Sequence, residues 1–162
     1  MAFDAYVKFD GIEGETTDAQ HKDWIEITSY NFGVSQKSSD TASSAGGASV
    51  GRANIREFYL TKACDKATPK LFSACCKGEH INNVNISINR AGGEKLKYLE
   101  ITLEEVLISD FINQGSEGEP SEHIELNYGR IKITYIQQKR ADGTGGGNIA
   151  GGWDRVGNKP YA

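Results

Sequence analysis

The residue pattern between Trp24 and Gln36 constrains the fold more than any other part of the chain. Its large apolar residues hold odd positions first and even positions afterwards: Ile25, Ile27, Tyr30, Phe32 and Val34. Alternation with a period of two is typical of a half-buried strand. The change of phase, beside Gly33, predicts a bulge or a sharp bend that redirects the strand within the fold.

Two further segments change phase in the same way. In residues 99–108 the apolar positions shift from odd to even near Glu104 and Glu105, and in 124–135 they shift from even to odd at Gly129. Strands that bend in this way close a sheet into a barrel or pass between two packed sheets. The sequence therefore predicts a mainly β protein, a β-barrel of two packed antiparallel sheets, formed by one domain over residues 1–140.

One helix is predicted, at about residues 68–77. Thr68 is a suitable N-cap, and Pro69 suits the first helical position because its missing N–H would have no partner there. Gly78 favours the left-handed conformation that ends many helices. An apolar stripe would dock this short flanking helix on the sheet, and it consists of Leu71, Phe72 and Cys75.

Two segments contain few apolar residues to bury. Residues 38–52, rich in Ser, Ala and Gly, are predicted to form a mobile loop, and loops this long in compact domains are usually functional or disordered. Residues 141–162 are predicted to form a C-terminal tail. Its Gly145–Ala150 stretch matches a dinucleotide-binding pattern but lacks the helix that such a site needs, which favours a flexible linker. Trp153 is the large residue that would anchor this tail on its own domain or on a neighbour.

Charge and composition argue against two classes of partner. The net charge is −4, and Lys139 and Arg140 are the only adjacent basic pair, so the chain lacks the clustered positive face that binds nucleic acid. No apolar run approaches the ~20 residues that cross a bilayer, and the N-terminus lacks the pattern of a secretory signal. We therefore expect a protein that is made in the cytoplasm, with no direct membrane insertion. The odd set of cysteines fits a reducing compartment, and comprises Cys64, Cys75 and Cys76.

The motifs for catalysis and metal binding are weak. Residues 47–51 match the G-x-S-x-G pattern of serine hydrolases around Ser49, and Asp110 and His123 follow in the hydrolase order. That pattern requires a strand before the serine and a helix after it, whereas a loop of small residues precedes Ser49 and a strand follows. Zinc sites need pairwise spacings that the histidines lack, so turn or surface positions are expected for His21, His80 and His123. The residues predict no catalytic site, no metal site and no cofactor, and a serine hydrolase using Ser49 is kept as an alternative.

Several stretches resemble the haemolysin-coregulated protein (Hcp) family, the tube subunits of type VI secretion systems. The resemblance covers essentially the whole chain, and the segment 65–71 is its most specific local signature. The other matching stretches are residues 2–9, 14–15, 21–25, 58, 61–62, 91–93, 98–107, 137–139 and the Gly-Trp-Asp sequence near the C-terminus.

The resemblance implies a phage tail-tube-like fold and a structural role without enzymatic activity. It implies that six copies form a ring, and that the rings stack into a tube, with its spike, inside a contractile sheath. Sheath contraction would export this tube from the bacterial cytoplasm to the medium or to a target cell, without a signal peptide. Small effectors would be carried inside the ring.

Three groups of residues are candidates for such a function. The loop at 38–52 is the candidate contact between subunits or rings, with Asp40, Ser43, Gly46, Gly47, Ser49 and Arg52. A small polar turn is the candidate for the lumen, with Gln114, Gly115 and Ser116. Trp153 is the candidate tail anchor. A monomeric β-barrel that binds a small ligand is the other alternative, and it predicts a ligand-sized interior and no higher oligomer.

Overall fold

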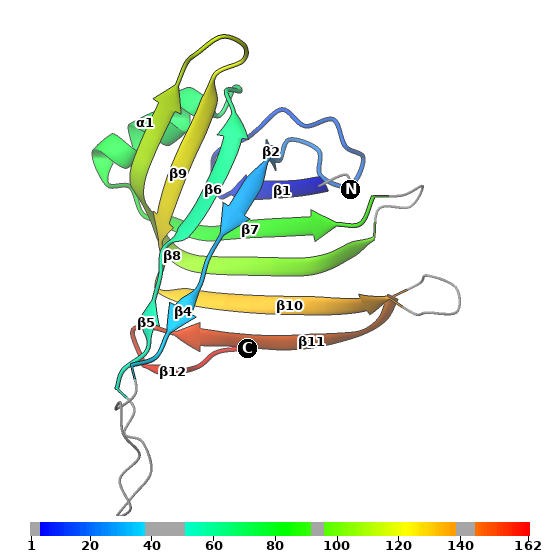
Figure 1. Cartoon of the computed structure of the whole chain (residues 1–162), viewed down its shortest axis with the longest axis vertical. Helices are drawn as coiled ribbons and strands as arrows, with labels where there is room; N and C mark the ends of the chain where they lie inside the picture. The colour runs from blue at the N-terminus through cyan, green and yellow to red at the C-terminus, as the bar shows by residue number, and fades with distance from the viewer. Residues whose placement is uncertain (1–3, 38–50, 92–95, 139–144) are drawn as a thin grey trace, which may run out of the picture.

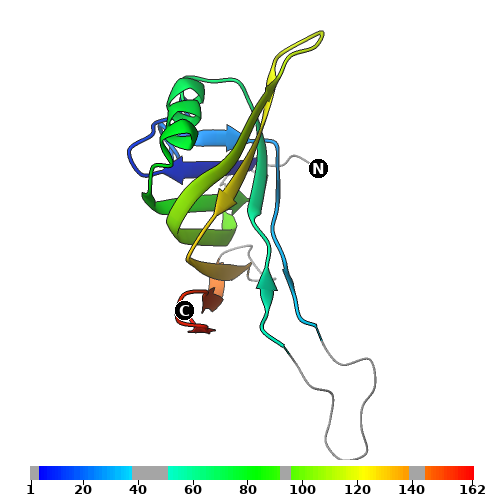
Figure 2. The same cartoon turned by 90° about the vertical axis from the view of Figure 1, so that its left-hand side faces the viewer.

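The structure, a computed structural model, describes residues 4–37, 51–91, 96–138 and 145–162 (Figures 1 and 2). The described residues form one helix, α1 (Thr68–Lys77), and twelve strands. The strands are β1 (Asp4–Phe9), β2 (Ile25–Ile27), β3 (Ser29–Asn31), β4 (Val34–Ser35), β5 (Asn54–Ile55), β6 (Phe58–Ala63), β7 (Ile81–Asn89), β8 (Lys97–Gln114), β9 (Ser121–Asn127), β10 (Arg130–Gln138), β11 (Gly145–Asp154) and β12 (Lys159–Pro160).

Most strands belong to two antiparallel sheets that share β8. Sheet A has the order β12-β11-β10-β8-β7-β1-β2, and sheet B has the order β3-β6-β9-β8. The first part of β8 pairs with β7 and β10, whereas its second part, from Leu107 to Gln114, pairs with β9. Strands β4 and β5 pair only with each other among the described strands, and we call this two-stranded ribbon the arm. The arm points away from the end of the molecule that holds α1 (Figure 1).

The chain passes from one sheet to the other at three places, and two of them are the phase changes predicted near Glu104–Glu105 and at Gly129. On either side of Thr28, β2 pairs with β1 in sheet A and β3 pairs with β6 in sheet B. In β8 the passage lies at Glu105, whose φ is 55°. The third passage, between β9 and β10, contains Gly129, whose N–H donates to the Glu104 carbonyl at 2.9 Å. The second and third corners therefore touch each other.

The first bend lies at Thr28 and not beside Gly33, where the sequence placed it. The Thr28 N–H donates to the Thr61 carbonyl at 2.8 Å, and the two threonine hydroxyls lie 2.9 Å apart. These bonds attach the chain to sheet B as soon as it leaves β2. Gly33 lies further on, between β3 and β4, where the arm begins.

The main core fills the space between the two sheets, as the alternation of apolar residues predicts. Fully buried side chains come from both sheets and from α1, and include Val7, Ile27, Phe58, Leu60, Leu71, Ile86, Ile101, Leu103, Ile124 and Leu126. The strand pairing does not close into a complete barrel. Strands β10, β11 and β12 continue sheet A past β8, beyond the end of sheet B and on the side where the arm begins (Figure 1).

Helix α1 occupies the predicted residues, but its N-cap differs from the prediction. The N-cap is Ala67, and Thr68 is already helical. The Thr68 hydroxyl accepts the Asp65 N–H at 3.0 Å and donates to the Glu122 carboxylate at 2.8 Å. Because this hydroxyl is used between the helix and β9, it does not cap the helix. At the other end Gly78 is left-handed with a φ of 61°, as predicted.

The described C-terminal residues belong to sheet A. Strand β11 pairs with β10 in antiparallel register, from Asp154 opposite Arg130 to Gly147 opposite Gln137. The Gly-rich stretch expected to be a flexible linker is therefore a strand, because a full-length partner supplies its hydrogen bonds. Glycine is also required within it: at Gly152 a Cβ would overlap the backbone carbonyl oxygens of Ile131 and Tyr161.

Candidate assembly surface

An apolar groove of about 280 Å³ lies between the arm and the part of sheet A beyond sheet B. The odd-numbered apolar residues of β10 belong to the core-facing side of the sheet, and their burial decreases along the strand. Ile131 is buried in the core, Ile133 is half-buried, and Tyr135 is exposed. Only the arm lies opposite, and it leaves the groove open. The lining residues are Phe32, Gly33, Val34, Ala53, Ile55, Tyr128, Ile131, Ile133, Gly152 and Trp153.

The apolar surface continues beyond the groove. Tyr135 and Ile149 are register partners on β10 and β11, and they are 41% and 68% exposed. Val34 on the arm is 63% exposed. Contiguous exposed apolar surface is typical of a site that contacts another molecule. This face of β10 and β11 therefore has the character of a core that lacks its second layer.

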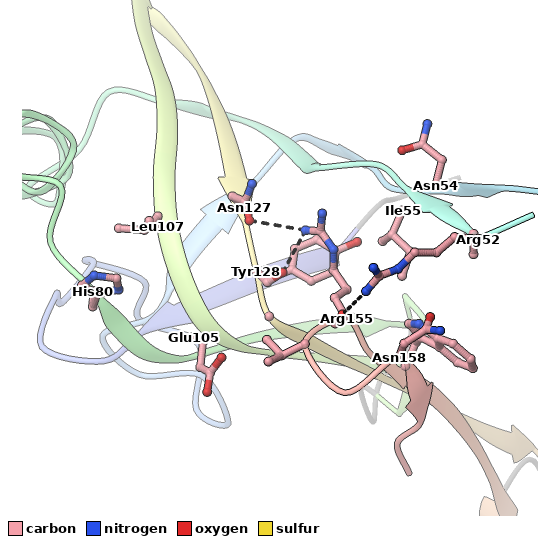
Figure 3. A pocket seen from close by; sticks show the side chains of 14 residues that line it. Arg52, Asn54, Ile55, His80, Glu105, Leu107, Asn127, Tyr128, Arg155 and Asn158 are labelled. Carbon is pink, nitrogen blue, oxygen red and sulfur yellow. Dashed lines mark hydrogen bonds between the residues drawn. The ribbon is translucent and has the colours of Figure 1, made fainter.

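A polar cavity of about 550 Å³ adjoins the groove at the base of the arm (Figure 3). The two share Ala53, Ile55, Tyr128 and Trp153. The remaining lining residues of the cavity are mainly polar or charged: Arg52, Asn54, His80, Glu105, Leu107, Asn127, Gly129, Arg155, Val156 and Asn158. An apolar site and a polar site thus lie side by side.

Two arginines, Arg52 and Arg155, line the polar cavity. Arg52 donates to the Arg155 carbonyl at 3.1 Å, and Arg155 donates to the Tyr128 carbonyl at 2.9 Å (Figure 3). The Arg155 guanidinium also lies 5.6 Å from the centre of the Tyr128 ring. Within the described ranges neither arginine has a carboxylate close enough for an ion pair. As far as the described residues show, their positive charge is not neutralised by a carboxylate of the same chain.

Tyr128 connects the base of the arm to the core. It is 2% exposed, and its hydroxyl donates to the Arg56 carbonyl at 2.8 Å. Burial raises the pKa of the Tyr128 phenol from 10.0 to about 12, against a smaller opposing effect of Arg155. The folded protein therefore holds this proton more tightly than the unfolded chain does.

The Tyr128 contribution to stability is expected to be fully present below pH 10 and to be lost as the pH rises toward about 12. In Tyr128→Phe this loss should be absent, whereas at neutral pH the missing hydrogen bond should cost about 1 kcal/mol. Urea unfolding of both proteins at several pH values measures the two effects. If the stability of the two proteins depended equally on pH, the loss at high pH would not come from Tyr128.

The structure separates the three groups of candidate residues. Five loop candidates lie outside the described residues: Asp40, Ser43, Gly46, Gly47 and Ser49. Arg52 is at the base of the arm, and Trp153 packs against the core of its own chain while lining both the groove and the cavity. The lumen candidates are exposed in and beside the β8–β9 turn, at the opposite end of the molecule (Figure 1): Gln114, Gly115 and Ser116.

The residues that follow Ser49 in the hydrolase order do not assemble as that alternative requires. Asp110 lies opposite Glu125 in the β8–β9 register, whereas His123 lies opposite Ile112. The acidic neighbour of the His123 ring is Glu125, at 3.8 Å. Among the described residues, no group of three His, Cys, Asp or Glu side chains is arranged to hold a metal ion.

A buried histidine forms an arrangement that the sequence did not predict. His21 lies in a turn, as expected, but its side chain is buried: it is 5% exposed and stacks on Tyr6. Its ring nitrogens lie 2.8 Å from the Asp18 carboxylate and 3.0 Å from the Ser87 hydroxyl. Ser87 is 1% exposed and Asn89 also donates to its hydroxyl, so this serine is held inside the fold. We interpret the set as a clasp that attaches residues 14–24 to sheet A.

The groove was not predicted from the sequence, although the sequence contains part of the pattern that produces it. The alternation through Ile131, Ile133 and Tyr135 predicts a strand with one apolar face. It does not say that sheet B ends before covering this face, because that depends on which strands pair. Arg155 gave no local signal, since its role comes from contacts with residues 127–128.

Solved structures define the class to which this fold belongs. One described as a type six secretion system protein superposes with a TM-score of 0.91 at 30% identity, over 99% of this chain and 100% of that chain. Hcp1 from Salmonella typhimurium superposes with a TM-score of 0.80 at 28% identity, with the same coverage. The fold is thus that of type VI secretion proteins with two antiparallel sheets and one helix.

The sequence comparisons identify the family. The family described as "Type VI secretion system effector, Hcp" matches residues 6–135. Protein hcp1 from Pseudomonas aeruginosa is 36% identical over 157 residues, which cover 95% of this chain and 96% of that protein. The chain belongs to the Hcp family of type VI secretion systems. None of its described helices has the length and apolar character needed to cross a membrane.

Proposed function

We propose that this chain is a structural subunit of the type VI inner tube and assembles as stacked hexameric rings. The observation that carries the proposal is the apolar side of β10 and β11, which its own sheet B does not cover. A protein that exposes the second half of a core in this way is stabilised when another copy covers it. Membership of the Hcp family supports the same conclusion.

A ring requires two different surfaces on each subunit, one for each neighbour. The arm side of sheet A and the outer face of sheet B are such a pair, because they lie on different parts of the molecule. We further propose that the loop at 38–52 contacts adjacent subunits or rings, because in sequence it connects β4 to β5, the two strands of the arm. Loss of residues 43–48 with unchanged rings and tubes would argue against that role.

The remaining parts of the proposal follow from the family. The tube would interact with the sheath and the spike, carry small effectors in its lumen, and leave the bacterial cytoplasm on contraction without a signal peptide. We propose that residues 114–116 face the lumen, since this exposed polar turn can contact cargo without an apolar surface. Unchanged effector retention in Ser116→Gln would contradict this placement. The role is structural, with no catalytic site and no cofactor.

The native mass tests the proposal directly. Light scattering after gel filtration is expected to give about six times the 17.6 kDa of one chain, and negative-stain images should contain rings. A stable monomer at all protein concentrations would contradict the tube function. That result would favour a small-ligand binding module that uses the groove.

A further inference from the structure

An acidic cluster occupies the outer face of sheet B. Glu57, which directly precedes β6, lies near Glu125 on β9, and so does Asp110 on β8. The Ser109 hydroxyl connects them, lying 2.8 Å from the Glu57 carboxylate and 3.2 Å from the Glu125 carbonyl. Asp110 and Glu125 are register partners.

The charges of this cluster are poorly compensated by the residues that the structure describes. Burial raises the pKa of Glu125, and its hydrogen bond to Glu57 and the charges of Glu57 and Asp110 raise it further. His123, 3.8 Å from Glu125, has only a smaller opposing effect. No lysine or arginine of the described segments forms an ion pair with these three carboxylates. The cluster therefore lacks a strongly basic partner.

Apolar surface lies beside the acidic cluster. Ile112 is 48% exposed and lies opposite His123, whose ring centre is 5.8 Å from that of Tyr59. The outer face of sheet B thus combines an exposed aliphatic side chain, an aromatic ring and carboxylates that form no ion pair with a lysine or arginine in the described part of the chain. The base of the arm combines an apolar groove with two arginines that form no ion pair with a described carboxylate. The two surfaces are complementary in charge and in apolar character.

We propose that the outer face of sheet B of a second copy docks against the base of the arm. The acidic cluster of the second copy pairs with Arg52 and Arg155 of the first copy. Ile112 of the second copy covers part of the apolar groove of the first. This inference rests on the proposed ring function and identifies which surfaces meet in it. The contact is heterologous, so each subunit uses one surface for each of its two neighbours.

The proposal predicts that each of two charge-reversal variants forms rings poorly by itself, and that an equal mixture of the two variants forms rings again. Arg52→Glu and Glu125→Lys each place like charges across every contact, and each should raise the protein concentration needed for rings by roughly tenfold or more. In an equal mixture the two variants can alternate around a ring with an even number of subunits. Every contact then pairs opposite charges, because Glu at position 52 meets Lys at 125, and Arg52 meets Glu125. Light scattering of each variant and of the mixture measures this recovery.

Three controls make the result decisive. Lys22→Glu reverses an exposed charge outside both surfaces and should leave the rings unchanged. Circular dichroism establishes that each variant is folded, and Glu57→Lys replaces Glu125→Lys if the latter is not. Wild-type protein that never forms rings would overturn the proposed function itself. Rings in the wild type that both variants form equally well, or a mixture that does not recover them, would overturn this docking mode and leave the tube function standing.

Discussion

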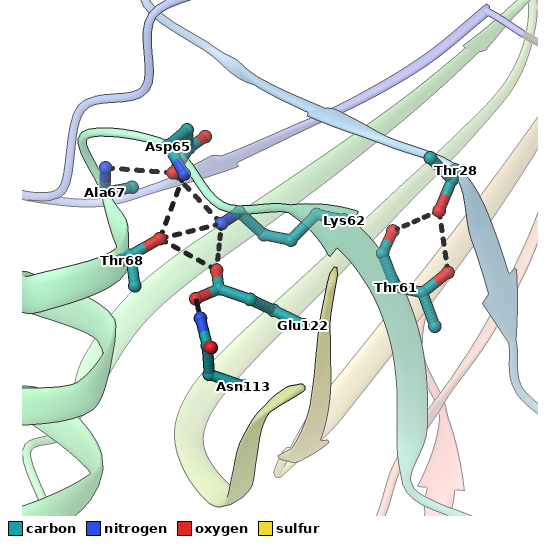
Figure 4. A network of polar contacts seen from close by, with 8 residues as sticks. All are labelled: Thr28, Thr61, Lys62, Asp65, Ala67, Thr68, Asn113 and Glu122. Carbon is teal, nitrogen blue, oxygen red and sulfur yellow. Dashed lines mark hydrogen bonds and ion pairs between the residues drawn. The ribbon is translucent and has the colours of Figure 1, made fainter. Parts of the chain in front are cut away.

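Replacing Lys62 by methionine is expected to lower the free energy of unfolding by about 3–5 kcal/mol. Lys62 and Glu122 are each 1% exposed, and their charged groups form an ion pair between β6 and β9 (Figure 4). The Lys62 ammonium also lies 3.0 Å from the Asp65 carboxylate. The substitution would leave Glu122 buried without a cation, held only by the Thr68 hydroxyl and the Asn113 amide, each at 2.8 Å.

Urea unfolding at one protein concentration measures this loss of free energy. In thermal unfolding the melting temperature should fall by roughly 10 °C, since about 1 kcal/mol corresponds to 2–4 °C in a chain of this size. The double variant Lys62→Met with Glu122→Leu should recover most of the loss, because it removes both charges. The matched control is Lys66→Met at an exposed pair with Glu13, which should change stability by less than about 1 kcal/mol. A loss at Lys62 no greater than at Lys66 would contradict the prediction.

The second large effect is expected for Gly152→Ala, which should lower stability by about 3 kcal/mol and detach β12. The added Cβ would overlap the backbone oxygens of Ile131 and Tyr161, and backbone cannot move aside as a flexible side chain can. The Tyr161 N–H donates to the Gly152 carbonyl at 3.1 Å, so displacement of this strand also breaks that bond. Because Gly152 lines the groove, we expect ring assembly to weaken as well.

The adjacent glycine provides the control for this prediction. At Gly151 a Cβ would meet no atom within 4 Å, so Gly151→Ala should be neutral or slightly stabilising. Thermal unfolding of the two variants, and hydrogen exchange at the β11–β12 amides, separate a local steric effect from a general intolerance of side chains in β11. Equal losses at the two positions would contradict the steric explanation.

The sequence was sufficient to predict those features of the fold that depend on residues close together in the chain. Interruptions of the alternation, placed beside Gly33, near Glu104–Glu105 and at Gly129, predicted two sheets connected by bending strands, although the first bend lies at Thr28. Pro69 and Gly78 predicted the ends of the helix. A one-residue change of phase moves every later side chain to the opposite face of the strand. Such a change can be recognised from a few consecutive residues, without knowing which strands pair. The mainly β fold class followed from them.

The features that sequence reasoning missed depend on partners far apart in the chain. Nothing near His21 indicates that Ser87 lies beside it, and nothing near Thr68 indicates that its hydroxyl bonds Glu122. The Gly-rich residues of β11 have little strand propensity, and they form a strand because β10 pairs with them. The candidate assembly surface also depends on distant partners, since Ile133 and Tyr135 look like ordinary core residues until the extent of sheet B is known.

The three passages of the chain between the sheets have a mechanical consequence. Two sheets that touch only through side chains can slide over each other when a load is applied along their faces. Here β2–β3, β8 and β9–β10 each run from one sheet into the other, at corners held by the Thr28–Thr61 and Gly129–Glu104 hydrogen bonds. Shear between the layers must therefore strain continuous backbone at three points. A subunit built in this way would keep its shape under an axial push that would distort a simple sandwich.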